Sequence, residues 1–222
     1  VVEDCRFEEV GGRGITVSNG SDPQVSRTTV VRSKEAGIHV WGKARGLFTD
    51  CTVEDAGGDG VRAEERAATS FVNLTVRGGA GISIGGNSTV EFDRGLVTGS
   101  EGPGFAVEAS NPFLRGVSVA DTRGQGVRFR KGGQGRLENV TFERTGKSAV
   151  QVDERSRPLL NGVSIRESRD GGVTVGAQGE ADLRDCDISD CASDGIAVQN
   201  GGKVSALRTR VYNSRRNGGL LA

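Results

Sequence analysis

The chain has 222 residues, with 29 basic and 29 acidic side chains, 36 glycines, four cysteines, and one each of tryptophan, tyrosine and histidine. This balanced charge gives no global reason to expect nucleic acid as a partner. No apolar run approaches the roughly 20 residues of a membrane-spanning helix, so we expect no membrane partner either.

A motif of glycine, apolar, variable and apolar residues recurs along the whole chain. Its first positions are Gly14, Gly37, Gly60, Gly81, Gly104, Gly126, Ala149, Gly172, Gly195 and Gly219. Successive copies are 23, 23, 21, 23, 22, 23, 23, 23 and 24 residues apart. Such regularity indicates a solenoid, in which each unit buries its apolar side against the next unit.

Each unit also contains an alternating apolar segment that precedes the motif. An apolar residue stands seven positions before most motif glycines, as at Phe7, Val30 and Val53. Alternation with a period of two predicts strands, and the polar, glycine-rich stretches between them predict turns. We therefore predict an all-β fold, a right-handed parallel β-helix (solenoid) of about ten coils with about 23 residues per coil.

The Gly-Ile-x-Val motifs and the apolar-x-apolar segments before them resemble the right-handed parallel β-helix repeats of the pectin-lyase-like superfold. They are most similar to the short-coil repeats of carbohydrate-binding and sugar-hydrolase β-helix proteins. The resemblance covers residues 1–222 and implies the fold more strongly than any function. Enzymes of that superfold build side walls from long insertions, whereas every unit here is short.

We expect residues 1–222 to form a single domain, a fragment of a larger multidomain bacterial protein. The chain begins and ends inside strand-like segments, without the polar capping units that solenoids need. A ratio of 24 Arg to 5 Lys suggests a GC-rich bacterial source. Similar repeat arrays occur beside other modules, including AAA-type ATPases. Uncapped coils also predict end-to-end self-association.

The four cysteines do not form a disulfide pattern. Cys5 and Cys51 share one inward column but lie two coils apart, about 9–10 Å, which is beyond the reach of a disulfide. Cys186 shares that column, and Cys191 takes a small-residue position. We expect buried free thiols, which favours a reducing compartment such as the cytoplasm, although the localisation stays unknown.

The variable motif positions must face outward, because their apolar neighbours fill the core. They place the candidate ligand-binding residues on one sheet face: His39, Trp41, Arg62, Glu64, Glu108, Arg128, Arg130 and Asp153. A tryptophan can stack on a sugar ring, and arginines bind carboxylates through two parallel hydrogen bonds. The alternative is a solvated sheet face with ion pairs between adjacent coils.

An enzyme is the alternative function: a lyase, hydrolase or epimerase acting on an acidic glycan. Glu64 and Glu108 are two coils apart, about 9–10 Å, close to the 6.5–9.5 Å of inverting glycosidases. Neighbouring arginines, however, would lower their pKa values and disfavour a general acid.

The sequence also contains no motif that predicts a metal or cofactor site. One histidine and four scattered cysteines supply no Cys-x-x-Cys pair. Corner aspartates such as Asp55 and Asp190 are expected to cap turns instead of binding calcium. The sequence therefore favours a non-catalytic binding or scaffold module, without metal or cofactor, that presents a flat sheet face to a polysaccharide or protein partner.

Overall fold

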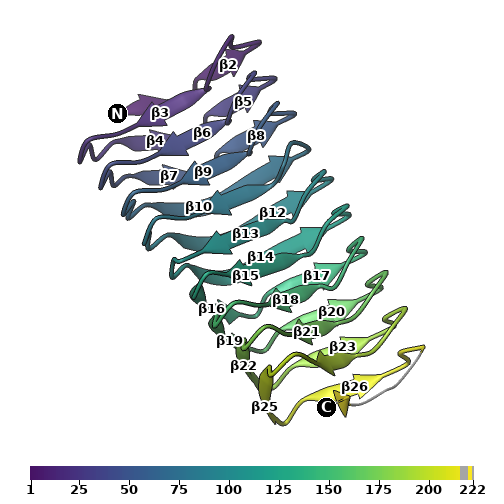
Figure 1. Cartoon of the computed structure of the whole chain (residues 1–222). Coiled ribbons are helices and arrows are strands. Elements are labelled where there is room, and N and C mark those ends of the chain that lie inside the picture. The colour runs from purple at the N-terminus through teal and green to yellow at the C-terminus, as the bar shows by residue number, and fades with distance from the viewer. Residues whose placement is uncertain (216–219, 222) are drawn as a thin grey trace.

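The computed structural model describes residues 1–215 and 220–221 of the chain. These residues form 27 strands and no helix, so none of them belongs to a helix long and apolar enough to cross a membrane. The strands of successive coils pair in parallel, and the coils follow one another from the N-terminal to the C-terminal end of the stack (Figure 1). The predicted all-β solenoid is confirmed. Gly219 and Ala222 of the tenth motif lie outside the described residues.

One ten-stranded sheet, here called sheet B, contains the glycine motifs. Coils are numbered by their sheet B strands, which in order are β3 (Ile15–Val17), β6 (Ile38–Val40), β9 (Val61–Ala63), β11 (Ile82–Ile84), β13 (Phe105–Glu108), β15 (Val127–Arg130), β18 (Val150–Val152), β21 (Val173–Val175), β24 (Ile196–Val198) and β27 (Leu220–Leu221). Equivalent motif positions pair in register, as Ile15 does with Ile38. The stack makes about nine full turns of about 23 residues.

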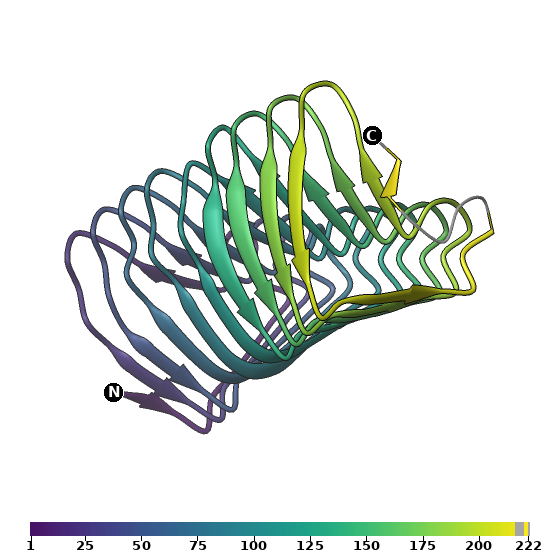
Figure 2. The ribbon, with the colours of Figure 1, turned by 90° about the horizontal axis from the view of Figure 1, so that it is seen from below.

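The other sheet, sheet A, has 17 strands and receives two segments from each coil. The first segments are β1 (Val2–Glu3), β4 (Gln24–Ser26), β7 (Leu47–Thr49), β16 (Gln134–Glu138), β19 (Arg157–Asn161), β22 (Glu180–Arg184) and β25 (Lys203–Leu207). The second segments are β2 (Arg6–Glu8), β5 (Thr29–Val31), β8 (Thr52–Glu54), β17 (Thr141–Glu143), β20 (Ser164–Arg166), β23 (Asp187–Ser189) and β26 (Arg210–Tyr212). Both segments merge in β10 (Ser70–Arg77), β12 (Glu91–Thr98) and β14 (Phe113–Ala120). Figure 2, which views the stack obliquely from below, shows the corners of successive coils following one another in rows.

Columns of like side chains fill the space between the two sheets. The predicted apolar column before the motif is buried at Val30, Val53 and Ile165, whereas Phe7 in the first coil is only partly buried. Phe48, Phe71 and Phe92 stack with ring centroids 4.9 Å apart at each step. Such offset-stacked rings add about 0.5–1.5 kcal/mol per pair beyond their area burial. The core therefore grows along the axis by repeating the same contacts in each coil.

The motif glycines are required by the coil that follows. A Cβ on Gly60 would lie 2.3 Å from Cγ1 of Val76, and a Cβ on Gly37 would lie 2.2 Å from Cγ1 of Val53. Neither glycine has a positive φ, so the backbone conformation would accept alanine. At these two positions glycine is needed because the buried valine of the next coil fills the space that a side chain would need.

Sheet B is followed in most coils by a tight turn with two consecutive residues of positive φ, as at Lys131 (52°) and Gly132 (73°). The N–H of Gly133 closes this turn by donating to the carbonyl of Arg130 at 2.9 Å. These are the features of a type I′ turn. The corner of the fifth coil has only Ala109 in this conformation, at 45°.

Strand register places a one-residue deletion in that fifth corner. Glu108 pairs with Arg130 before the corner, and Phe113 pairs with Arg136 after it. The fifth coil therefore crosses in five steps (113 − 108) what the sixth crosses in six (136 − 130). The turn of the fifth coil consequently reaches out less far than its neighbours do.

The cysteines are free, as predicted, but differ in burial. Cys51, Cys186 and Cys191 are buried, whereas Cys5 is only half-buried because it lies before the first complete coil of the stack. Burial raises the pKa of all three buried thiols, and that of Cys191 to about 11. The expectation of a buried thiol is therefore wrong for Cys5.

Candidate ligand-binding face

The eight predicted residues all lie on the outer side of sheet B or directly after its strands, in two groups. The group in the second and third coils contains His39, Trp41, Arg62 and Glu64, and the group in the fifth to seventh coils contains Glu108, Arg128, Arg130 and Asp153. Small residues separate the groups, since Ser83 and Ala106 lie in register between Arg62 and Arg128. Three strand spacings put these two arginine Cα atoms about 14 Å apart.

Glu64 is the centre of the first group. Its Oε1 lies 2.9 Å from Nε2 of His39, and its Oε2 accepts hydrogen bonds from Nε and Nη2 of Arg62 at 3.1 and 3.0 Å. Burial raises the pKa of this carboxyl, but the hydrogen bonds from His39 and Arg62 outweigh burial and hold the pKa below its usual range. Glu64 is therefore ionised, and Nε2 of His39 carries the proton that it accepts.

His39 points outward, as the alternation requires, yet it is only 4% exposed. Its ring stacks on that of Trp41, with centroids 6.3 Å apart and an interplanar angle of 20°. Together with the Glu64 carboxylate, this stacking covers the imidazole. The prediction of an exposed histidine is wrong, because the side of a sheet that a residue occupies does not determine what covers it. Trp41 is half-buried and is held by the same contact.

Most side chains of the second group are hydrogen-bonded or ion-paired to other residues of the chain. Arg130 donates to Oε1 of Glu154 at 2.8 Å, and Nζ of Lys131 lies 2.5 Å from Oε2 of Glu108. Oδ2 of Asp153 accepts a hydrogen bond of 2.8 Å from the Gln151 amide. These contacts hold three of the four predicted residues in internal pairs.

Arg128 differs from these neighbours. Its side chain makes no hydrogen bond, ion pair or ring contact with any residue that the structure describes, and the residue is half-buried. In the sheet it lies between Ala106 on one side and Gln151 on the other. Arg128 therefore presents a guanidinium with free donors at the middle of the face.

Many other arginines form ion pairs with carboxylates of the adjacent coil, as the alternative interpretation of the surface predicts. Such bridges include Arg27 with Asp4 at 2.7 Å, Arg144 with Asp121 at 2.7 Å, and Arg208 with Asp185 at 2.6 Å. Hydrogen bonds from these arginines lower the pKa of each of the three carboxyls. Exposed pairs of this kind add little to the stability of a fold, because water and salt screen the attraction between the charges. The unpaired state of Arg128 is thus a departure from the usual pattern of this surface.

Metal ligands are not gathered anywhere in the described residues. No group of three or more His, Cys, Asp or Glu side chains is arranged to hold an ion in residues 1–215. The corner aspartates Asp55 and Asp190 have φ values of 50° and 55°. They occupy left-handed positions, which Asp and Asn tolerate better than most residues do.

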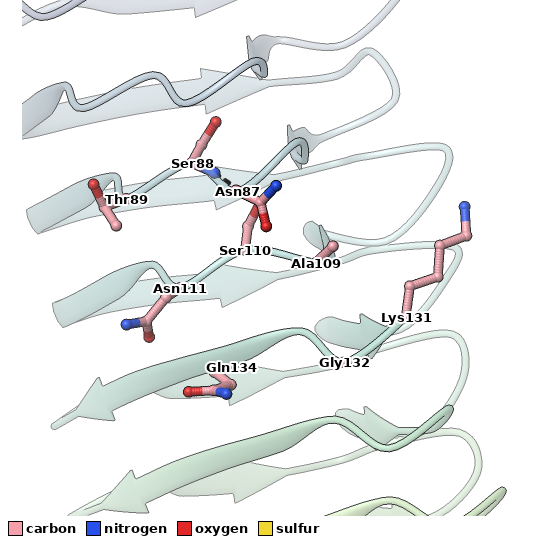
Figure 3. A pocket seen from close by; sticks show the side chains of 9 residues that line it. All are labelled: Asn87, Ser88, Thr89, Ala109, Ser110, Asn111, Lys131, Gly132 and Gln134. Carbon is pink, nitrogen blue, oxygen red and sulfur yellow. Dashed lines mark hydrogen bonds between the residues drawn. The ribbon is translucent and has the colours of Figure 1, made fainter. Parts of the chain in front are cut away.

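A polar pocket of about 320 Å³ lies beside this face, where the shortened corner of the fifth coil meets its neighbours (Figure 3). Its lining includes Asn87 from the fourth coil, Asn111 from the fifth, and Lys131 and Gln134 from the sixth. None of these was predicted as a site residue. The one signal in the sequence is the 22-residue spacing between motif glycines that brackets the deletion.

The comparison with known proteins agrees with this architecture. The model of the right-handed β-helix region family matches in three overlapping stretches, residues 1–112, 59–165 and 126–221. No curated protein matches the chain significantly. The match spans nearly the whole chain and confirms the predicted hand of the solenoid. The chain therefore belongs to the right-handed β-helix family.

Proposed function

We propose that this β-helix is a non-catalytic binding module that presents the outer face of sheet B to an acidic polysaccharide. The observation that carries the proposal is Arg128, a half-buried arginine without an internal partner. A guanidinium offers five N–H donors in a planar fork that matches a carboxylate. A uronate carboxylate of the ligand would supply the partner that the chain itself does not.

The arrangement of the face suits an extended ligand. A polymer lying along the stack would pass over Ser83 and Ala106, whose small side chains let it approach the sheet closely. Arg62 lies at the far end of this stretch, about 14 Å from Arg128. Its Nε and Nη2 are bonded to Glu64, which leaves its Nη1 group for a ligand. Two acidic units of one chain could therefore be held at separate points.

An acidic-glycan lyase, hydrolase or epimerase is less well supported. A glycosidase acid needs a raised pKa, whereas the pKa of Glu64 is lowered by His39 and Arg62. Glu108 pairs with Lys131 at 2.5 Å. In a longer protein, the binding face would serve other domains, such as an ATPase of the AAA type. An acidic protein partner would contact the same arginines and is a separate outcome of the test.

The test measures binding by isothermal titration calorimetry, because Trp41, the sole tryptophan, lies four coils away from Arg128. The protein is titrated with uronic-acid oligosaccharides, with neutral oligosaccharides and with an acidic peptide, as wild type, Arg128→Ala and Arg128→Lys. Loss of a charge-assisted hydrogen-bond pair is expected to weaken uronate binding by about 10–100-fold in Arg128→Ala. Arg128→Lys recovers only part of that loss, since a lysine cannot bind a carboxylate bidentately.

Arg144→Ala is the matched control, because it removes the same charge from an arginine that is already paired with Asp121. Equal uronate binding by wild type and Arg128→Ala, or equal losses in both alanine variants, refutes the proposal. Binding of the peptide alone indicates a protein partner. Shortened or epimerised sugar products after incubation would assign the face to an enzyme.

A further inference from the structure

The pocket at the fifth corner has a rigid floor. The N–H of Ser88 donates to Oγ of Ser110 at 3.1 Å, and Oγ of Ser88 donates to the carbonyl of Gly85 at 2.7 Å. The bond between Ser88 and Ser110 ties the short turn of the fifth coil to the corner of the fourth (Figure 3), and the bond between Ser88 and Gly85 lies within the fourth corner itself. The hollow is thus a fixed consequence of the one-residue deletion.

Three carboxamides surround this hollow, one from each of three consecutive coils: Asn87, Asn111 and Gln134. All three are exposed, and none of their side chains has a hydrogen-bond partner among the described residues. Each carboxamide has two donors and an acceptor oxygen. The pocket therefore presents several free donors and acceptors at once.

The remaining lining narrows the class of ligand. No carboxylate lines the pocket, which argues against a metal cation. Lys131, its one cation, is engaged by Glu108, which weakens the case for a free anion. The methyl group of Ala109 offers too little apolar surface for a lipid. A compound whose groups both donate and accept hydrogen bonds fits, and vicinal hydroxyls do both.

We infer that this pocket is a subsite for one neutral sugar ring, held by Asn87, Asn111 and Gln134. Its volume of about 320 Å³ is near the lower end of the roughly 300–1,000 Å³ of small-molecule sites. The inference rests on the proposed function, because the pocket adjoins the arginine face through the pair of Glu108 with Lys131. A glycan whose acidic unit meets Arg128 can place a neutral unit at the corner.

The sharpest test restores the missing residue. One glycine inserted between Ala109 and Ser110 gives the fifth corner the same length as its neighbours and fills the hollow. Side-chain NH2 signals of Asn111 and Gln134 are followed by NMR while neutral gluco-, manno-, galacto- and xylo-oligosaccharides are added. At least one series is expected to shift these signals in the wild type, and the insertion is expected to weaken binding at least tenfold.

Two substitutions keep the test independent of the insertion. Asn111→Ala and Gln134→Ala each remove one neutral hydrogen bond, so each is expected to weaken neutral-sugar binding about fivefold. Gln24→Ala, at an exposed glutamine in the first segment of sheet A, is the matched control and leaves binding unchanged. Thermal melts of every variant verify the fold.

The outcomes separate the subsite from the proposed function. If no neutral sugar shifts the pocket signals while uronates still bind in an Arg128-dependent manner, the subsite is refuted and the proposed function stands. If neutral sugars shift the pocket signals and Arg128→Ala leaves uronate binding unchanged, the subsite stands and the proposed function is refuted. Neutral-sugar affinity that survives the insertion, or pocket signals that respond to peptides alone, also overturns the inference.

Discussion

The contact between Gly60 and Val76 allows a direct test of why the motif requires glycine. In Gly60→Ala the new methyl group would lie 2.3 Å from Cγ1 of Val76, while the next neighbours, the carbonyl oxygen of Gly81 and Cβ of Val76, are 3.3 and 3.6 Å away. The clash therefore involves one side chain almost alone. Removing that side chain by Val76→Ala should make room for the methyl group.

The magnitudes follow from the packing. Overfilling a packed core costs about 1–3 kcal/mol, so Gly60→Ala should destabilise the fold by that amount. Val76 is 0% exposed, and truncating it to alanine removes two buried methyl groups and leaves a cavity, at a cost of about 2–3 kcal/mol. Additivity predicts about 3–6 kcal/mol for the double variant. We expect about 2 kcal/mol, because the new methyl group occupies space that Val76 vacates.

Urea unfolding of the four proteins in the double-mutant cycle measures this coupling. Gly37→Ala with Val53→Ala is the matched control. There the new Cβ would also lie 2.7 Å from the backbone carbonyl of Gly60, which no side-chain truncation removes. Rescue should therefore occur at Gly60 and fail at Gly37. Strict additivity at Gly60, or equal rescue at both positions, would refute the steric explanation.

Two further predictions concern titratable groups. Because the folded-state pKa of Glu64 lies below its ordinary value of 4.5, its ionised form stabilises the fold above about pH 4.5, and this contribution is lost as the pH falls through the folded-state pKa. Glu64→Gln should lower the melting temperature at pH 7 and match the wild type near pH 2, and an equal difference at both pH values would contradict this. Iodoacetamide at pH 8 should label half-buried Cys5 first, since burial raises the pKa of Cys51, Cys186 and Cys191. Mass spectrometry of the native protein that found Cys191 labelled as fast as Cys5 would contradict this assignment.

The architecture could be predicted because a solenoid repeats local information. The spacing of the glycine motifs determines which residues stack, and the alternation within each strand determines which of them face the core. Val30 and Val53 could therefore be assigned to one buried column without any knowledge of distant contacts. Every coil contacts only its neighbours, so one repeating rule accounts for the whole core.

The candidate face could be predicted only in part. The alternation correctly put Arg128 and Arg130 on the same outer side of one strand. It could not tell that Glu154 of the next coil engages Arg130 while Arg128 stays unpaired. The same limit explains His39, which faces outward but is covered by Trp41 and Glu64.

The sequence by itself determined the fold, the repeat length and the side of the sheet on which each residue lies, because these follow from periodicity. The hand follows from the right-handed crossovers that join parallel strands. Only the tertiary structure decided which outward side chains pair, which are covered, and where a pocket opens. Those outcomes depend on side-chain reach between coils and on corner shape. The missing residue near Ala109 appears in the sequence only as one short spacing between motif glycines. Strand register assigns the deletion to the corner of the fifth coil, and the pocket lies at that corner.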